Sequence, residues 1–280
     1  MPRVIVNADD LGLCPSVNRA IFEVYAAGNL NSATLMVNMP GTHDAVVGLS
    51  HHPGLAVGLH FCITEGKALT GRSPLTDGAG VFLGRTALIR RMLSGKVPSA
   101  AIREEFDAQW DLAVALGVVP DHVDSHQHVM MLPAILDAVL PAIHQRKVPT
   151  RIVAPPWTTI TSDRMRPRRA LKQAANLAFA TYARHRLKVP KNSALVSIHD
   201  LEHAGPYDAN TFHTLIARAH ASADLEVMVH PYLLGSDVKD LYASVWQDKE
   251  PFLRRCAAEY EALLAPGIFS GLDLITFNDL

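Results

Sequence analysis

The sequence predicts a single (β/α) barrel of about seven or eight parallel strands, and two patterns in the chain indicate it. Short apolar runs of strand type alternate with helical segments along the chain, which is typical of βα units and a parallel sheet. Several of these runs end in carboxylate or imidazole side chains, as expected where the C-terminal strand ends of a barrel share one face. The length of 280 residues suits one barrel of roughly 250 residues. We therefore expect one domain over residues 1–280.

The expected strands are short runs rich in Val, Ile, Leu and Ala, bounded by turn residues or by charged residues. They cover residues 4–6, 32–37, 55–59, 122–125, 151–154, 195–198, 225–229 and 273–277. Helices are expected between them, where apolar residues recur at helical spacing. They cover residues 17–27, 42–50, 87–93, 102–116, 133–145, 163–188, 209–222 and 250–264. Residues 64–84 are rich in Gly, Pro, Thr and Asp, which predicts a long loop beside the site.

Composition excludes several classes of partner. A formal charge of -1 and a pI near 6.9 give no electrostatic reason to expect nucleic acid or an anionic membrane, so a small neutral substrate fits better. Cys14, Cys62 and Cys256 lack CxxC spacing and indicate neither a disulfide framework nor a cysteine zinc site. The first strand begins by Val4, and no apolar run approaches the ~20 residues of a membrane span. We expect a cytoplasmic protein.

Four strand ends carry side chains suited to one shared site. They are Asp9, Asp10, His60, His126, His128 and His230. Carboxylates are rarely buried unless they are paired or bind a metal, so convergence of these ends predicts a metal site. Two imidazoles and one carboxylate leave open positions on a divalent ion, which lowers the pKa of bound water to about 7 and polarises a carbonyl. Asp9 is suited to accept the proton of the water, and His230 to protonate a departing amine.

Each candidate also has an alternative interpretation. Neighbours on a regular strand face opposite sides, so Asp9 and Asp10 share a pocket only if the strand has already ended, with a turn at Gly12. Otherwise one of them is a helix N-cap or a surface acid. His126 and His128 share a face of an extended backbone, and one or both could bind metal. Asp124 on that face could instead accept a hydrogen bond from a ligand imidazole.

Five segments together resemble the YdjC-like carbohydrate deacetylases, a family that includes chitooligosaccharide deacetylases and hopanoid-biosynthesis proteins. They are Val6–Gly12, Leu35–Asn38, Val57–Phe61, Val123–His128 and Glu226–Pro231. They occur in family order, and the resemblance extends to Ile275–Leu280. The chain departs from the family pattern at Leu11, where Phe is usual, and at Met130, where a further His is common.

The resemblance implies a deformed (β/α) barrel related to that of the polysaccharide deacetylases, and hydrolysis of the N-acetyl group of an amino sugar. Asp10, His60 and His126 would then hold one divalent metal ion, either zinc or magnesium. Asp9 would be the general base and His230 the general acid, although the order of roles within the aspartate pair is left open. A homodimer would be in keeping with the family.

Six further residues are assigned to substrate binding or to support of the ligands. They are Asn38, Asp124, His128, Arg151, Trp157 and Tyr232. Trp157 and Tyr232 either stack on a sugar face or pack in the core. The basic segment 164–188 is either a solvated helical face or a site for an anion or partner.

Two other functions fit the same strand ends. One is a phosphoesterase, in which Arg151 or the basic segment 164–188 would hold phosphate. The other is a sugar-binding protein without catalysis, which would need neither Asp9 nor His230 as a proton-transfer group.

Overall fold

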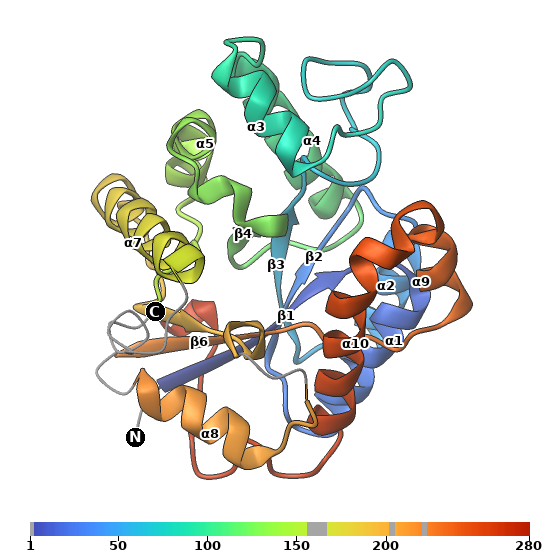
Figure 1. Ribbon diagram of the computed structural model, residues 1–280, viewed down its shortest axis with the longest axis vertical. Coiled ribbons are helices and arrows are strands. Elements are labelled where there is room, and N and C mark those ends of the chain that lie inside the picture. The colour runs from blue at the N-terminus through green and yellow to red at the C-terminus, as the bar shows by residue number, and fades with distance from the viewer. Residues whose placement is uncertain (1–2, 156–166, 202–204, 220–222) are drawn as a thin grey trace.

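The computed structural model describes residues 3–155, 167–201, 205–219 and 223–280. Within these residues, seven parallel strands form one sheet in the order β4-β3-β2-β1-β6-β5, with β7 paired to the first residues of β1 (Figure 1). The strands are β1 (Arg3–Leu11), β2 (Ser32–Leu35), β3 (Ala56–Phe61), β4 (Val123–Ser125), β5 (Ala194–Val196), β6 (Asp224–Val229) and β7 (Asp273–Leu274). The predicted parallel α/β barrel is confirmed.

Helices surround the sheet in Figure 1, as βα units require. They are α1 (Pro15–Ala26), α2 (Thr42–Ser50), α3 (Arg85–Leu93), α4 (Ser99–Ala115), α5 (Pro133–Arg146), α7 (Pro167–Arg186), α8 (Ala209–Arg218), α9 (Ser236–Leu241) and α10 (Trp246–Leu263). Residues 64–84 hold no helix or strand, as predicted. Across the described ranges, no helix is both long enough and apolar enough to cross a bilayer.

An irregular segment completes the barrel between its two edge strands. We expected a strand at residues 151–154, but only an isolated bridge joins Thr150 to Val123 of β4. The Arg151 N–H nevertheless donates to the Val123 carbonyl at 2.9 Å, and the Leu195 N–H of β5 donates to the Ala154 carbonyl at 2.9 Å. The segment therefore connects β4 to β5 with few regular ladder bonds, which is where the barrel is deformed.

The two faces of the strands differ in polarity. Val4, Val6 and Ala8 of β1 belong to the main apolar core with the helices, whereas Ile5 packs in a small separate cluster with Ile275 and Phe277. Above that cluster, the inward positions are polar on several strands. They include Asn7, Ser32, Thr34, His60, Asp124 and Glu226, all buried. The barrel interior is therefore a hydrogen-bonded polar network, in contrast to the aliphatic layers common in this architecture.

The turn after β1 requires a glycine. Gly12 has φ +91°, and a Cβ there would lie 2.4 Å from the Met36 carbonyl oxygen. Met36 follows β2, and its N–H donates to the Leu11 carbonyl at 2.7 Å. This hydrogen bond holds the two strand ends close together. Gly12 thus fixes the approach of β1 and β2 beside the two aspartates.

We expect Gly12→Ala to lower the free energy of unfolding by about 1–2 kcal/mol from its backbone conformation and by about 1–3 kcal/mol more from the overlap. Gly95→Ala is the matched control, because Gly95 also has positive φ but has nothing within 4 Å of the added Cβ. Urea unfolding followed by circular dichroism measures both changes. Equal losses in the two variants would show that the close approach to Met36 contributes nothing.

Candidate functional site

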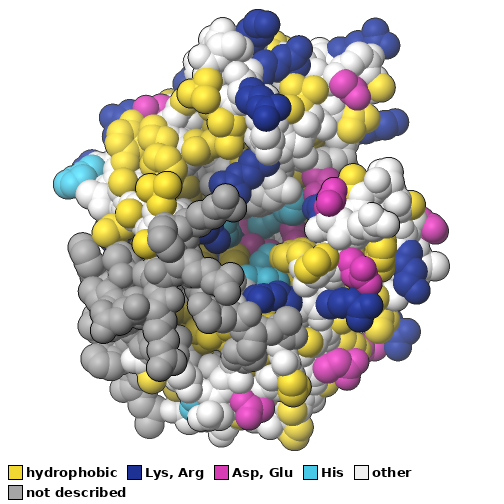
Figure 2. Space-filling view, viewed as in Figure 1, with side chains coloured by type: hydrophobic (Ala, Val, Ile, Leu, Met, Phe, Trp, Pro, Cys, Tyr) yellow, Lys and Arg dark blue, Asp and Glu magenta, His cyan; other side chains and the backbone are white. Residues whose placement is uncertain are grey.

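The C-terminal strand ends surround a pocket with a cavity volume of about 270 Å³. The histidines that line it are His60, His126, His128, His199 and His230. Asp9 and Asp10 line it as well, and Figure 2 shows histidine and acidic side chains at the centre of the hollow. Residues from segments more than two hundred positions apart therefore meet in one place.

A bulge in β1 turns both aspartates into this pocket. We expected the strand to end before Asp9, but it continues to Leu11. Its register with β2 shifts between Ala8 and Leu11, and Asp10 has φ +69°. The left-handed residue interrupts the alternation of side chains, so two neighbouring carboxylates face the same side. The expected shared pocket is therefore present, but a bulge within the strand produces it.

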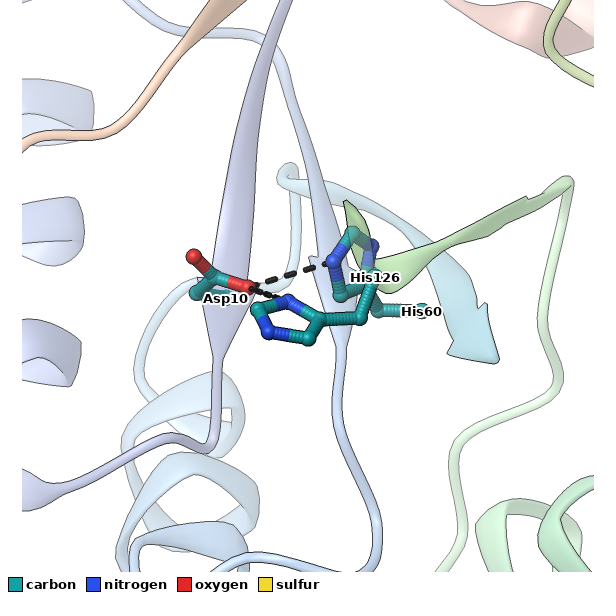
Figure 3. Close-up of side chains that lie close together, drawn as sticks. All are labelled: Asp10, His60 and His126. Atoms are coloured by element: carbon teal, nitrogen blue, oxygen red, sulfur yellow. Dashed lines mark hydrogen bonds and ion pairs between the residues drawn. The ribbon is translucent and has the colours of Figure 1, made fainter. Parts of the chain in front are cut away.

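Asp10, His60 and His126 converge on one oxygen atom (Figure 3). The Oδ1 atom of Asp10 lies 3.1 Å from Nε2 of His60 and 2.9 Å from Nδ1 of His126. The other oxygen, Oδ2, accepts a hydrogen bond from the Tyr232 hydroxyl at 2.5 Å. One carboxylate oxygen and two imidazole nitrogens, all buried, thus form a compact set of possible metal ligands.

A carboxylate holds the far nitrogen of each of these imidazoles. Asp124 Oδ1 lies 2.7 Å from Nδ1 of His60, and Glu65 Oε2 lies 3.1 Å from Nε2 of His126. Such outer carboxylates fix the ring orientation and raise the basicity of imidazoles that bind metals. Both histidines are therefore held with one nitrogen directed at Asp10.

The charges of the set suit a divalent cation. Burial alone would lower the pKa of each imidazole, but the surrounding carboxylates raise that of His60 well above its usual value and that of His126 to about 10. The carboxylates therefore favour two positive charges between them. Two protons or one divalent cation can supply those charges, and an imidazole must lose its proton to bind a metal. The donor atoms present fit such an ion.

Asp9 belongs to a second buried cluster, which is built around Arg151. The guanidinium contacts both oxygens of Asp9 at 2.6 and 2.7 Å, Asp124 at 2.5 Å and Glu226 at 2.5 Å. Arg151 is 1 % exposed. It therefore holds Asp9 from the interior of the barrel and cannot contact a substrate in the pocket. Burial raises the pKa of Asp9, but Arg151, together with His60 and His230, outweighs this effect and holds the pKa well below its usual range. Asp9 is ionised at neutral pH.

His230 faces Asp9 from the end of β6, with its Nε2 3.9 Å from Asp9 Oδ2. Its backbone N–H donates to Glu259 Oε2 of α10 at 2.7 Å. Burial lowers its pKa despite the nearby aspartates, so the ring is neutral at pH 7. The pocket therefore offers an ionised carboxylate and a neutral imidazole beside each other, with 3.9 Å between their nearest atoms.

His126 and His128 do not lie on an extended strand, contrary to our expectation. β4 ends at Ser125, and a 3₁₀ helical segment follows at His126–Met131. Within it, Gln127 and His128 depart from helical geometry, with φ +53° and +57°. Both histidines still line the pocket. Burial and the neighbouring Arg151 lower the pKa of His128 to about 3, so it is neutral. Backbone strain of this kind is concentrated at functional sites.

Comparisons with known proteins show the family to which the chain belongs. The model of the family described as YdjC-like protein matches residues 3–272. The chain belongs to the YdjC-like family. A carbohydrate deacetylase of Brevibacillus brevis is 42% identical over 164 residues, which cover 58% of this chain and 62% of that relative. A chitooligosaccharide deacetylase of Yersinia enterocolitica is 39% identical over 150 residues, or 53% of this chain and 58% of the relative.

These matches span less than two thirds of either relative. A solved structure from Enterococcus faecalis V583, named for cellobiose-phosphate cleavage, has a TM-score of 0.74 and 21% identity to this chain. It covers 99% of this chain and 98% of its own, and at this identity it shows a common fold.

The other predicted residues of this YdjC-like chain lie in different places. Tyr232 lines the pocket but holds Asp10, so its hydroxyl is committed to that carboxylate. Asn38 lies after β2 and donates to the Glu65 carbonyl at 2.9 Å, so it fastens the loop that carries Glu65. Trp157 lies outside the described residues. Of the basic segment, Arg184 and Lys188 are exposed, as on a solvated helical face.

Sequence reasoning missed several residues in or beside the pocket of this YdjC-like chain. His199 follows an apolar run, as His60 and His230 do, and this same signal could have identified it. Glu65 lies five residues after His60, in a loop whose path the sequence did not indicate. The rest come from the C-terminal helical region and carry no local signal. They are Tyr242, Lys249, Phe252 and Glu259.

We expect Arg151→Met to lower the free energy of unfolding at pH 7.5 by about 3–5 kcal/mol, because it leaves buried carboxylates unpaired. Unpaired buried carboxylates have raised pKa values, so the variant regains stability as the pH falls and they are protonated. In the parent protein, the pKa of Asp9 is lowered, so its contribution is still fully present at pH 5.5 and is lost only below the pKa of a free aspartate. The difference between the two proteins should therefore narrow at pH 5.5.

Arg186→Met is the control, because Arg186 pairs with Asp137 at a half-exposed position where ion pairs contribute little. Urea unfolding at both pH values gives the four comparisons. A loss for Arg151→Met no greater than for Arg186→Met would contradict the buried cluster.

Proposed function

We propose that this chain is a metal-dependent hydrolase that removes an N-acetyl group from an amino sugar or an N-acetylated glycoconjugate. The observation that carries the proposal is the convergence of Asp10, His60 and His126 beside the neighbouring side chains of Asp9 and His230. The named activities of the relatives in Brevibacillus and Yersinia support the choice of substrate class.

Asp10, His60 and His126 would hold one divalent cation, zinc or magnesium. Such a cation supplies Lewis acidity for a carbonyl oxygen and makes a water molecule more acidic. Asp124 and Glu65 keep the two imidazoles oriented, and Tyr232 keeps the second oxygen of Asp10 occupied. Three fixed ligands that leave positions open are typical of catalytic sites.

Asp9 is placed to accept the proton of the attacking water. Arg151 keeps it ionised at neutral pH and holds both its oxygens, so the carboxylate cannot rotate away from the pocket. Because Asp9 is committed to Arg151, Asp10 is the member of the pair that is free to bind the cation. This geometry supports the division of roles within the aspartate pair.

His230 is placed to protonate the amine nitrogen as the amide bond breaks. Its lowered pKa makes the protonated ring a stronger acid than free imidazole, so a proton gained during the reaction is readily passed to the amine. Asp9 lies 3.9 Å away and is a near source of that proton. Asp9 can thus pass the proton taken from water to His230, which delivers it to the amine nitrogen.

The pocket continues into a second cavity of about 400 Å³, which shares His128, His199, Met228 and Phe252 with it. The second cavity is larger than the pocket itself, so space beyond the proposed metal ligands is available to a substrate. We infer that the rest of a larger substrate lies in the second cavity.

The two other functions have less support. A phosphoesterase would need a free cation to hold phosphate, but Arg151 is buried among three carboxylates. Among the described pocket residues, the basic side chain Lys249 lies 3.6 Å from Glu65, which offsets its charge. A sugar-binding protein without catalysis would not need Asp9 and His230 as a pair of proton-transfer groups.

We expect His60→Ala to weaken zinc binding at this site by about 100-fold or more, since it removes one of three ligands. The measurement is calorimetric titration of the chelator-treated protein. His213→Ala is the control, because His213 Nε2 donates to the Ile268 carbonyl, lies far along the chain from the ligands and does not line the pocket. Unchanged binding by His60→Ala would remove His60 from the ligand set.

We expect Asp9→Asn to retain the metal and to lower the rate of acetate release by about 100-fold or more, as for loss of a general base. The assay measures acetate from a panel of N-acetylated sugars with zinc, with magnesium and with a chelator. A loss of metal in Asp9→Asn would instead make Asp9 a ligand. Release of phosphate from phosphorylated sugars without any acetate would support the phosphoesterase.

A further inference from the structure

A second group of possible ligands lies behind His230. His199, His230 and Glu259 each offer one ligand atom, and these atoms lie within 4.8 Å of one another. The three residues come from the end of β5, the end of β6 and α10. The rings of His199 and His230 meet edge to face at 5.0 Å, and Nε2 of His199 lies 3.9 Å from Oε2 of Glu259. None of these contacts belongs to the set around Asp10.

Each member has a buried atom that no other described residue satisfies. These atoms are Nε2 of His199, Nδ1 of His230 and Oε1 of Glu259. Glu259 is fully buried, and its other oxygen accepts the His230 N–H. A buried polar atom without a partner costs about 1–3 kcal/mol, so three of them in one cluster call for a shared ligand.

The chemistry of the three atoms indicates which ligand that is. Two neutral imidazoles and a carboxylate are a ligand set of zinc, whereas magnesium prefers oxygen atoms. Burial and His230 lower the pKa of His199 to about 2, so the ring is neutral at pH 7 and one of its two nitrogens is free to bind a metal. Tetrahedral ligand atoms at zinc lie about 3.4 Å apart, so small side-chain movements close the set.

We propose that His199, His230 and Glu259 form a second transition-metal site, which binds zinc when zinc is in excess of the first site. Because the second ion takes up a nitrogen of His230, it opposes protonation of that ring. If His230 is the proton donor of the proposed function, zinc in excess of one equivalent inhibits the enzyme. The second site then limits activity at high zinc.

The test is zinc stoichiometry of the full chain after chelator treatment, by equilibrium dialysis and metal analysis. The parent protein is expected to bind two zinc ions, and Glu259→Gln and His199→Phe one each. Glutamine preserves an acceptor for the His230 N–H, and phenylalanine preserves the ring beside Phe252. His60→Ala is expected to keep the second ion, and His185→Ala, which removes an exposed surface histidine, to bind two.

One zinc ion in the parent protein, or two in both Glu259→Gln and His199→Phe, would overturn the proposal. Circular dichroism of each variant verifies folding, and either variant alone suffices if the other does not fold. Acetate release at one and at three equivalents of zinc then tests inhibition, with at least a tenfold decrease expected in the parent protein. Two bound ions without any acetate release would leave the second site standing and reject the deacetylase activity.

Discussion

The arrangement of the site depends on one buried guanidinium. Arg151 lies in the irregular segment that closes the barrel, and it joins Asp9 of β1, Asp124 of β4 and Glu226 of β6. A single charge thus links the neighbouring strands β1 and β6 to β4 at the edge of the sheet. Removing it would leave carboxylates buried without a partner, which is among the most costly changes a protein interior can undergo.

The position of each reactive group follows from this arrangement. Asp124 contacts Arg151 through one oxygen and the His60 ring through the other, so the guanidinium cluster also orients a proposed metal ligand. Burial and the surrounding acids raise the pKa of Glu226 to about 7 despite Arg151, because one cation does not balance three carboxylates. The interior therefore retains negative charge, and a divalent ion beside Asp10 would reduce it. The same set of buried charges therefore affects both the stability of the fold and the binding of a metal ion.

The sequence predicted what depends on local pattern. Apolar runs that end in Asp10, His60, His126 and His230 are visible in the chain, and the barrel topology explains why they meet. The bulge at Asp10 could not be predicted, because its positive φ depends on the close approach of β2 at Gly12.

Contacts between distant segments were also beyond the sequence. Glu65 reaches His126 from a loop without periodicity, and Glu259 reaches His230 from a helix whose other buried residues serve the core. The predicted strand at residues 151–154 is irregular because Arg151 takes part in the polar cluster as well as the backbone contacts to β4. These features arise from tertiary packing, which a single sequence does not encode in any short pattern.

The surroundings of His230 have opposing effects on the pKa of its ring. Burial and the nearby His60 and Arg151 disfavour its protonation, whereas Asp9 and Asp10 favour it. The imidazole is therefore neutral, and once protonated it is a stronger acid than a free imidazolium ion. Glu259 fixes the backbone of His230 and also has a raised pKa, of about 8, because it is buried without a cation. A cation bound beside Glu259 would stabilise the ionised carboxylate and the neutral imidazole together, which links occupancy of that cluster to the proton that His230 can carry.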